Sequence, residues 1–254
     1  MGKLSPIVAA VRSHVHTVGE RPTSAQPSPP FVTISREAGA GGRTLMRRLV
    51  ARLNDIDPPG LGQTPWTGFD KELVEKVSQD HNLHKTLVDM LGEQCHSWLY
   101  DVFAGLSAQT TETQVYRRVA ETIRGLAQGG RAVIVGRGGV FITQNMPRGV
   151  HLQIVAPFEH RVEQMARVLD CDHKHAANEV RRIDQNRTSF YKRYWPDTPL
   201  CPSIFTATFN SAAISEEKMV EAVLPLIPGL KGANSGNPAG AGSPGVMTRR
   251  VVVK

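Results

Sequence analysis

Cysteine is scarce in this chain of 254 residues. The 3 cysteines lie far apart in the sequence, at Cys95, Cys171 and Cys201. No Cys-x-x-Cys pair exists, which argues against a disulfide framework or a cysteine-ligated zinc site and indicates a reducing compartment. On a helix, His81 and His84 would share a face, but no third ligand stands near them in the sequence, so we predict no metal site.

A long hydrophobic run is also missing. No apolar stretch approaches the roughly 18 residues that are needed to span a membrane. Near the N-terminus, Ile7–Val11 is too short for the hydrophobic part of a secretory signal, and Arg12 follows it at once. These absences predict a soluble, cytoplasmic protein with no membrane partner.

Acidic residues are fewer than basic ones. The chain has 23 Asp and Glu against 30 Lys and Arg, a formal charge of +7, while hydrophobic residues make up 40%. That hydrophobic share is ordinary for a soluble globular protein with one sizeable core. The positive balance favours an anionic partner, either a nucleotide or a nucleic acid, although many proteins without such a partner share it.

Each end of the chain contains a segment of biased composition. Residues 21–30 read RPTSAQPSPP, which is typical of a flexible linker, so residues 1–30 are predicted to be a flexible N-terminal extension. Residues 229–246 are dominated by Gly, Pro, Asn, Ser and Ala and cannot bury enough apolar surface to fold. We therefore predict a disordered tail over 229–254 and one folded domain over about 31–228.

Within that domain, short β-prone runs alternate with helical patterns. Four runs predict strands, at Phe31–Ser35, Ala132–Val135, His151–Val155 and Ile204–Phe209. One helix is predicted to end at Gly129–Gly130 and to bury the stripe Val115, Val119, Ile123 and Leu126. Ser215 is the predicted N-cap of the last helix. Such alternation predicts an α/β fold, in which helices cover both faces of a parallel sheet.

The stretch from Asp70 to Gly129 is almost entirely helical in its pattern. Its apolar positions include Leu73, Val77, Leu87, Leu91, Trp98, Leu99 and Phe103. A helical insert of this kind suits a substrate-binding subdomain. A plain pair of helices packed on the sheet explains the same pattern equally well.

A glycine-rich turn, SREAGAGGRT, spans Ser35–Thr44 between a β-prone run and an amphipathic helix. Gly39, Gly41 and Gly42 allow backbone N–H groups to converge at the start of that helix, where its dipole favours an anion. The segment does not match G-x-x-x-x-G-K-[ST]. Taken alone, it is equally consistent with a phosphate-binding loop and with a tight turn that binds nothing.

A second motif, VIVGRGG, places Arg137 at the end of a predicted strand, where open α/β sheets bind their ligands. Its planar guanidinium can pair with a phosphate through two hydrogen bonds. The alternative is a surface arginine in a tight turn.

The segment Arg161–Tyr194 is a basic helical stretch that contains RRIDQNR. Over a polyphosphate, its arginines would neutralise the charge of a transferring group. Asp184 and Arg187, three residues apart, can also be a plain surface ion pair.

Together, ISREAGAGGR, FDKELVEKV, VIVGRGG and RRIDQNR resemble, in order and spacing, the cytidylate kinase-like branch of the nucleoside monophosphate kinases. The resemblance covers about 31–228, and this branch has a Gly-Gly-Arg turn in place of Gly-Lys-Ser/Thr. It implies a P-loop kinase-like three-layer sandwich with a central parallel sheet. It also implies a helical substrate-binding insert at about 70–129 and a helical lid at about 170–200.

The resemblance further implies transfer of the ATP γ-phosphoryl group to a nucleoside monophosphate, CMP or dCMP, with Mg²⁺. The residues that would hold the donor phosphates are Arg36, Gly39, Ala40, Gly41, Gly42, Arg43 and Thr44. Asp70, which follows a strand-like Trp66–Phe69, and Arg137 match the acceptor site. Arg181, Asp184 and Arg187 match the phosphate-contacting arginines of the lid and their carboxylate partner, and with Arg137 they are the predicted catalytic residues.

Two positions depart from the family pattern. Gly138 stands where cytidylate kinases have an aspartate that helps to recognise the pyrimidine. Arg43 stands where the magnesium-binding hydroxyl is expected, which leaves Thr44 or Ser35 as substitutes. Gly138, together with Gly42 in the place of the usual P-loop lysine, motivates an alternative, a nucleotide-binding regulatory module that has lost catalysis. Nucleic-acid binding through the basic lid and tail is a weaker alternative, and the oligomeric state is not predicted.

Overall fold

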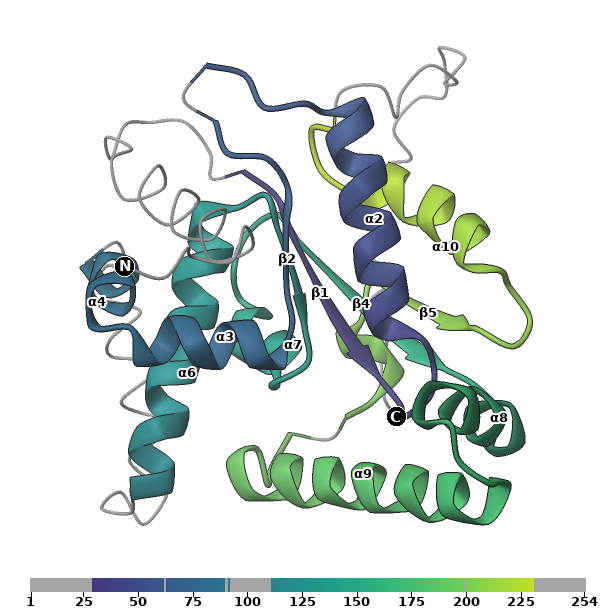
Figure 1. Ribbon diagram of the computed structural model, residues 1–254. Helices are drawn as coiled ribbons and strands as arrows, with labels where there is room; N and C mark the ends of the chain where they lie inside the picture. The colour runs from purple at the N-terminus through teal and green to yellow at the C-terminus, as the bar shows by residue number, and fades with distance from the viewer. Residues whose placement is uncertain (1–28, 62, 90, 92–110, 199, 231–254) are drawn as a thin grey trace, which may run out of the picture.

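The sheet consists of five parallel strands in the order β2-β3-β1-β4-β5. The computed structural model describes residues 29–61, 63–89, 91, 111–198 and 200–230. The strands are β1 (Phe31–Arg36), β2 (Thr67–Phe69), β3 (Ala132–Val135), β4 (Gly149–Val155) and β5 (Ala207–Asn210). The central strand β1 aligns Val32 with Val133 of β3 and with Val150 of β4. Figure 1 shows this arrangement, which confirms the predicted parallel α/β sheet.

The helices form two layers, one on each face of the sheet. One face is covered by α2 (Gly42–Ile56) and α10 (Glu216–Val223), and the other by α3 (Lys71–Gln79), α4 (His81–Asp89), α6 (Thr111–Gly129) and α7 (Gly139–Thr143). Alternation along β1 supplies both cores, because Phe31 packs in the α6 layer whereas Val32 and Ile34 pack in the α2 layer. The result is the predicted three-layer sandwich.

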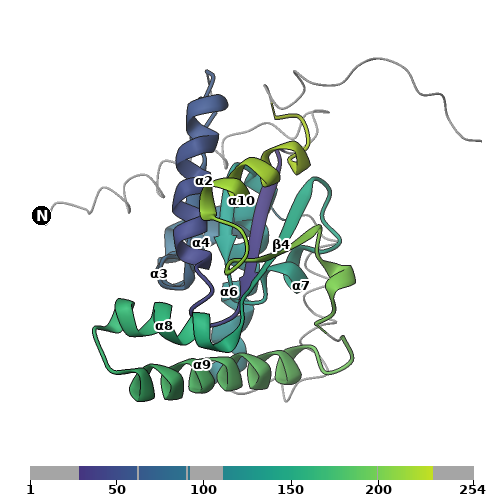
Figure 2. The ribbon, with the colours of Figure 1, turned by 90° about the vertical axis from the view of Figure 1, so that its right-hand side faces the viewer.

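A helical hairpin lies across the carboxyl edge of the sheet. It consists of α8 (Phe158–Leu169) and α9 (His173–Tyr194), which run side by side in Figure 2. Asp172 caps α9 by accepting a hydrogen bond of 2.8 Å from the backbone N–H of His175. Val162, Ala177 and Val180 form a small core between the two helices, and Ala38 of the glycine turn packs into it. The hairpin is therefore in direct contact with that turn.

Several predicted boundaries shift. Strand β4 begins at Gly149, and β5 begins only at Ala207, because Pro202–Ile204 forms a 3₁₀ turn, η1. A second 3₁₀ turn, η2 (Leu224–Leu226), follows α10. Ser215 caps α10 as predicted, by accepting from the N–H of Lys218 at 3.4 Å.

The buried stripe of α6 differs from the prediction at one position. Val119, Ile123 and Leu126 are buried, but Val115 is 50% exposed and Tyr116 takes its place in the core. Tyr116 is turned inward because its ring packs against Tyr194 at 4.2 Å between centroids. The contact between Tyr116 and α9, which is remote in sequence, therefore decides which residue of this turn of helix α6 faces the core.

Some predictions fall outside the described residues. These are the N-terminal extension and the tail, except for their inner residues 29–30 and 229–230, together with Cys95, Trp98, Leu99 and Phe103. In the described ranges, no helix combines the length and hydropathy needed to cross a bilayer.

Candidate functional site

The glycine-rich turn connects the carboxyl end of β1 to α2. Gly39 and Gly41 adopt positive φ values of 76° and 85°, which glycine tolerates without strain. Gly41 is the N-cap of α2, and the backbone N–H groups of Gly42, Arg43 and Thr44 have no acceptor among the residues that the structure describes. Unpaired N–H groups and the positive end of the helix dipole make this turn suited to bind an anion.

Arg36 lies at the end of β1, just before the turn. Within the described ranges, no carboxylate lies within ion-pair distance of its guanidinium. Burial, with a further contribution from the neighbouring Arg187 charge, lowers the pKa of Arg36 to about 10. The guanidinium lies so close to Gly136, after β3, that any side chain at that position would collide with it. Arg36 is therefore an uncompensated positive charge held beside two strand ends.

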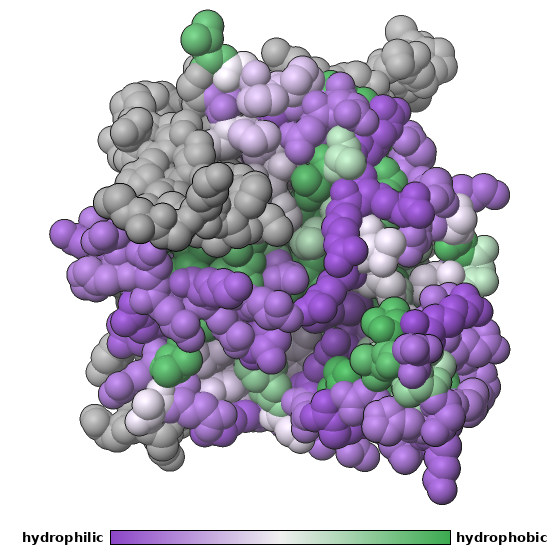
Figure 3. Space-filling model, in the orientation of Figure 1, coloured by the Kyte–Doolittle hydropathy of each residue, from purple (hydrophilic) through white to green (hydrophobic). Residues whose placement is uncertain are grey.

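Arg36 lines a cleft of about 310 Å³ that is strongly cationic. The residues around this cleft are Arg36, Lys71, Arg137, Arg182, Ile183, Asn186, Arg187, Phe190 and Tyr191, none of which is acidic. The surface over α3 and α9 is mainly hydrophilic (Figure 3). We call this space the arginine cleft. Its charge and its position at the strand ends fit an anionic ligand.

Arg137 enters the arginine cleft from the turn after β3. Its backbone has a φ of 55°, and its carbonyl accepts a hydrogen bond of 2.8 Å from the Tyr116 hydroxyl. The guanidinium pairs with Glu75 of α3, whereas its buried Nε has no partner among the described residues. The structure thus fixes Arg137 through both its backbone and its side chain.

Asp70 and Arg43 lie beside the cleft and face one another. The Asp70 carboxylate caps α3 by accepting from the N–H of Leu73 at 3.0 Å. Arg43 Nε lies 3.7 Å from Asp70, and its Nη2 lies 3.2 Å from Glu72. The Arg43 side chain is therefore directed toward the start of α3.

Helix α9 separates the predicted lid arginines between two faces. Arg187 lines the arginine cleft, whereas Arg181 stacks over the Phe158 ring at 4.7 Å. That second face borders a more open hollow of about 490 Å³. Arg182, which belongs to the basic segment but is not among the predicted site residues, lies in the arginine cleft instead.

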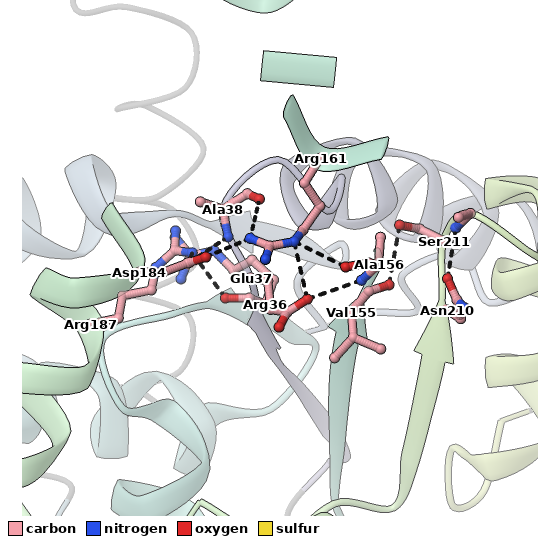
Figure 4. Close-up of polar contacts among 11 residues, drawn as sticks. Arg36, Glu37, Ala38, Val155, Ala156, Arg161, Asp184, Arg187, Asn210 and Ser211 are labelled. Carbon is pink, nitrogen blue, oxygen red and sulfur yellow. Dashed lines mark hydrogen bonds and ion pairs between the residues drawn. The ribbon is translucent and has the colours of Figure 1, made fainter. Parts of the chain in front are cut away.

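Asp184 faces the glycine turn itself. Its Oδ1 accepts from the backbone N–H of Ala38 at 2.9 Å, and its Oδ2 accepts from Arg161 (Figure 4). Arg187 donates to the carbonyl of Arg36 at 3.1 Å and to Asp184 Oδ1 at 3.4 Å. Burial lowers the pKa of Arg187, although Asp184 opposes that shift. These contacts join α9 to the end of β1.

The structure brings together Arg36, Arg137 and Arg187 from three separate motifs, and it adds Lys71, Arg182 and Asn186 to them. Helical spacing could have identified Arg182 and Asn186, because they lie four residues apart on one face of α9. No local pattern distinguishes Lys71 or the buried Arg161. In the part of the chain that is described, no group of three or more His, Cys, Asp or Glu side chains is placed to hold a metal ion.

Comparisons with known proteins bear on the fold and the family. The chain is similar to the crystal structure of an uncharacterized protein from Eubacterium ventriosum, with a TM-score of 0.61 and 17% sequence identity over 79% of this chain and 98% of that one. At that identity the likeness shows the fold alone. No curated protein matches the chain. The model of the cytidylate kinase-like family matches residues 31–213, well over half of the sequence, and the chain therefore belongs to the cytidylate kinase-like family.

Proposed function

We propose that this protein transfers the γ-phosphoryl group of ATP to a nucleoside monophosphate, with CMP and dCMP as the first acceptors to test. Membership of the family indicates a nucleotide kinase-type function. The observation that carries the proposal is the arginine cleft, because its cationic side chains converge beside a glycine turn with free N–H groups. Such a site suits ligands that carry several phosphates.

In this proposal, the turn from Gly39 to Thr44 and Arg36 bind the donor phosphates. Arg137, with Asp70 nearby, positions the acceptor, and Arg187 stabilises the transferring group with Asp184 as its carboxylate partner. Arg182 joins them, whereas Arg181 lines the second hollow and lies outside the cleft. An oxygen of the acceptor phosphate attacks the γ-phosphorus, and ADP leaves with the bridging oxygen. That attacking oxygen is already anionic near neutral pH, so catalysis consists of positioning and charge stabilisation.

The residues present are compatible with Mg²⁺ that arrives with ATP. Mg²⁺ is usually bound by substrate phosphates and only one or two protein oxygens, so a dedicated group of carboxylates is not required. Thr44 is exposed in the first turn of α2, whereas Ser35 is buried and its hydroxyl interacts with Tyr191. Thr44 is thus the better of the two predicted hydroxyl ligands. The bound ion would neutralise part of the phosphate charge.

The same proposal assigns roles to the parts of the fold. Residues 31–228 form one kinase domain, the helices within about 70–129 form the substrate-binding insert, and α9 supplies most of the lid at about 170–200. ATP as the donor is consistent with the predicted cytoplasmic location.

A second candidate is nucleotide binding without transfer. It is favoured by Arg43, which is held by Asp70 and Glu72 at the start of α3. A panel of nucleoside monophosphates with ATP and Mg²⁺, followed by ADP release, separates the two candidates. Turnover with at least one acceptor supports the kinase. Calorimetric binding of ATP with no turnover across the panel supports the regulatory module and contradicts the kinase.

A further inference from the structure

The backbone of Ala38 in the glycine turn is held through both its N–H and its carbonyl. Its N–H donates to Asp184 Oδ1 at 2.9 Å, and its carbonyl accepts from Arg161 Nη1 at 3.2 Å. Arg161 Nη1 also donates to Asp184 Oδ2. These three contacts close a ring, in which one carboxylate and one guanidinium satisfy the donor and the acceptor of residue 38 (Figure 4).

Further bonds anchor this ring to the sheet. Arg161 Nε donates to the carbonyl of Ala156, after β4, at 3.0 Å. Glu37 Oε2 lies 3.4 Å from the same Nε and accepts from the N–H of Ala156 at 3.0 Å. The Arg161 guanidinium therefore connects the glycine turn, the end of β4 and α9 through Asp184.

The position of Arg161 leaves it little freedom to move. The residue is only 8% exposed, and a side chain at Gly39 would collide with its backbone carbonyl. A buried guanidinium must be paired and hydrogen-bonded, because its desolvation is otherwise costly. Here those partners are supplied by the turn itself, so the shape of the turn and the burial of Arg161 depend on each other.

The ring leaves the start of α2 free. It uses the amide of Ala38, while the N–H groups of Gly42, Arg43 and Thr44 keep no acceptor in the described part of the chain. Asp184 therefore occupies none of the three amides at which the helix dipole favours an anion. Asp184 contacts the turn at Ala38 instead, where a hydrogen bond can fix the conformation of the turn.

We infer that Arg161 and Asp184 are positioning residues, which hold the glycine turn in the conformation that binds donor phosphate. Neither side chain has to touch ATP, because both act through the backbone N–H and carbonyl of Ala38. The inference rests on the proposed function in so far as the turn is the donor site. It gives Arg161 a role, and it gives Asp184 a second role, support of the turn, in addition to its pairing with Arg187.

The test compares Arg161→Lys, Asp184→Asn and their combination. Lysine keeps the charge but cannot reproduce the planar set of donors, whereas asparagine keeps an acceptor for the Ala38 N–H and weakens the bond to Arg161 together with the longer contact of 3.4 Å to Arg187. We expect Arg161→Lys to raise the Kd and the KM for ATP by about tenfold or more, and Asp184→Asn to have a smaller effect. The KM for the acceptor should stay unchanged. The double variant should resemble Arg161→Lys, because both changes break one ring.

Arg167→Lys is the matched control, since Arg167 lies on the same helix and, among the residues with described positions, pairs only with Glu163, at 3.7 Å on the surface. Circular dichroism melts show whether each variant folds. If Arg161→Lys does not fold, the ATP affinity of Asp184→Asn tests the inference. The inference is overturned if the folded variants bind ATP as the wild type does, or if both KM values rise together.

Failure of the inference is distinguishable from failure of the proposed function. If the wild type transfers phosphate and the variants match it, the kinase stands and the inference falls. If the wild type binds ATP without transferring phosphate, the kinase falls, and the Kd values for ATP still decide the inference. If the wild type binds no nucleotide, both fall.

Discussion

The Trp195 ring lies against the α-carbon of Gly138. A Cβ atom at position 138 would be 2.6 Å from that ring and 3.0 Å from the Tyr116 hydroxyl. Trp195 is fixed there because it stacks on Phe141, with centroids 4.8 Å apart and planes 18° apart. Gly138 also has a φ of 72°, which disfavours any other residue. The aspartate that cytidylate kinases carry at this position is therefore excluded by the aromatic packing of this chain.

The first prediction follows from that packing. Gly138→Asp should lower the free energy of unfolding by about 2–4 kcal/mol, through overpacking and backbone strain. It should not raise the preference for CMP over other acceptors. Urea denaturation and the acceptor panel measure the two effects. Gly139→Ala is the control, because its Cβ would meet Thr33 at an ordinary 3.5 Å. A Gly138→Asp variant as stable as the wild type would contradict the packing argument.

The charge of Arg36 should favour ATP binding and lower the stability of the folded protein. Its pKa is lowered to about 10, chiefly by burial, so folding disfavours the charged form. Arg36→Met, which keeps the hydrocarbon stem, should raise the Tm in phosphate-free buffer and abolish measurable ATP binding. Arg52→Met should change neither strongly, because Arg52 lies on the surface of α2 and pairs with Glu221 at 2.9 Å. A lower Tm with unchanged ATP affinity would refute this role.

Substitution by alanine should destabilise the protein more at Gly39 than at Gly41, although both residues have positive φ values. At Gly39 the new Cβ would collide with the Arg161 carbonyl, whereas at Gly41 its nearest neighbour is Glu216 Oε1 at 3.6 Å. We expect Gly41→Ala to cost about 1 kcal/mol from the backbone alone, and Gly39→Ala to cost roughly 3 kcal/mol or more. Urea denaturation of the two variants measures this difference. Equal losses would show that the contact with Arg161 relaxes freely.

Arg137→Ala should abolish detectable transfer or reduce kcat by about 10²–10³-fold, as expected for loss of a preorganised charge at the reacting group. The fold should remain, because the Tyr116 bond goes to the backbone of residue 137 and survives the change. Coupled ADP release measures turnover. Arg193→Ala, also cationic but exposed and paired with Glu112 at 2.8 Å, should keep wild-type activity. Wild-type turnover by Arg137→Ala would remove this residue from the mechanism.

His151 should make the protein acid-sensitive. It is buried in β4, its Nδ1 lies 2.8 Å from the Thr33 hydroxyl, and burial lowers its pKa to about 4. As the pH falls, the imidazole of His151 therefore binds a proton in the unfolded chain near pH 6.5, the ordinary histidine value, but in the folded protein only near pH 4. Above about pH 6.5, His151 does not lower the free energy of unfolding. Between about pH 6.5 and pH 4, preferential protonation of the unfolded chain lowers that free energy by up to roughly 3 kcal/mol.

Denaturation curves of the wild type and of His151→Gln between pH 7 and pH 4.5 test this prediction. The wild type should lose more stability over the interval than the variant, because only the wild type has the buried imidazole. Parallel losses in the two proteins would show that other groups cause the acid sensitivity.

The arginine cleft was only partly predictable from the sequence. The turn at Gly39–Gly42 and Arg137 could be identified because each follows a β-prone run, and parallel strands place such ends at one edge. The direction of each side chain could not be predicted. Arg43 belongs to the glycine motif but reaches Asp70, and Arg181 belongs to the lid motif but stacks on Phe158. Those directions depend on how α2, α3 and α8 cross.

The sequence by itself determined features that a few neighbouring residues encode. The β-branched run Ala132–Val135 is a strand with the predicted ends, and Ser215 caps its helix, because propensity and capping act within one turn of chain. Only the tertiary structure decided that Arg161 and Asp184 form hydrogen bonds with the backbone of Ala38, from which they are 123 and 146 residues distant. Contacts at such separations arise when elements pack, since packing geometry and desolvation select the partner of each charge, and no local pattern specifies them.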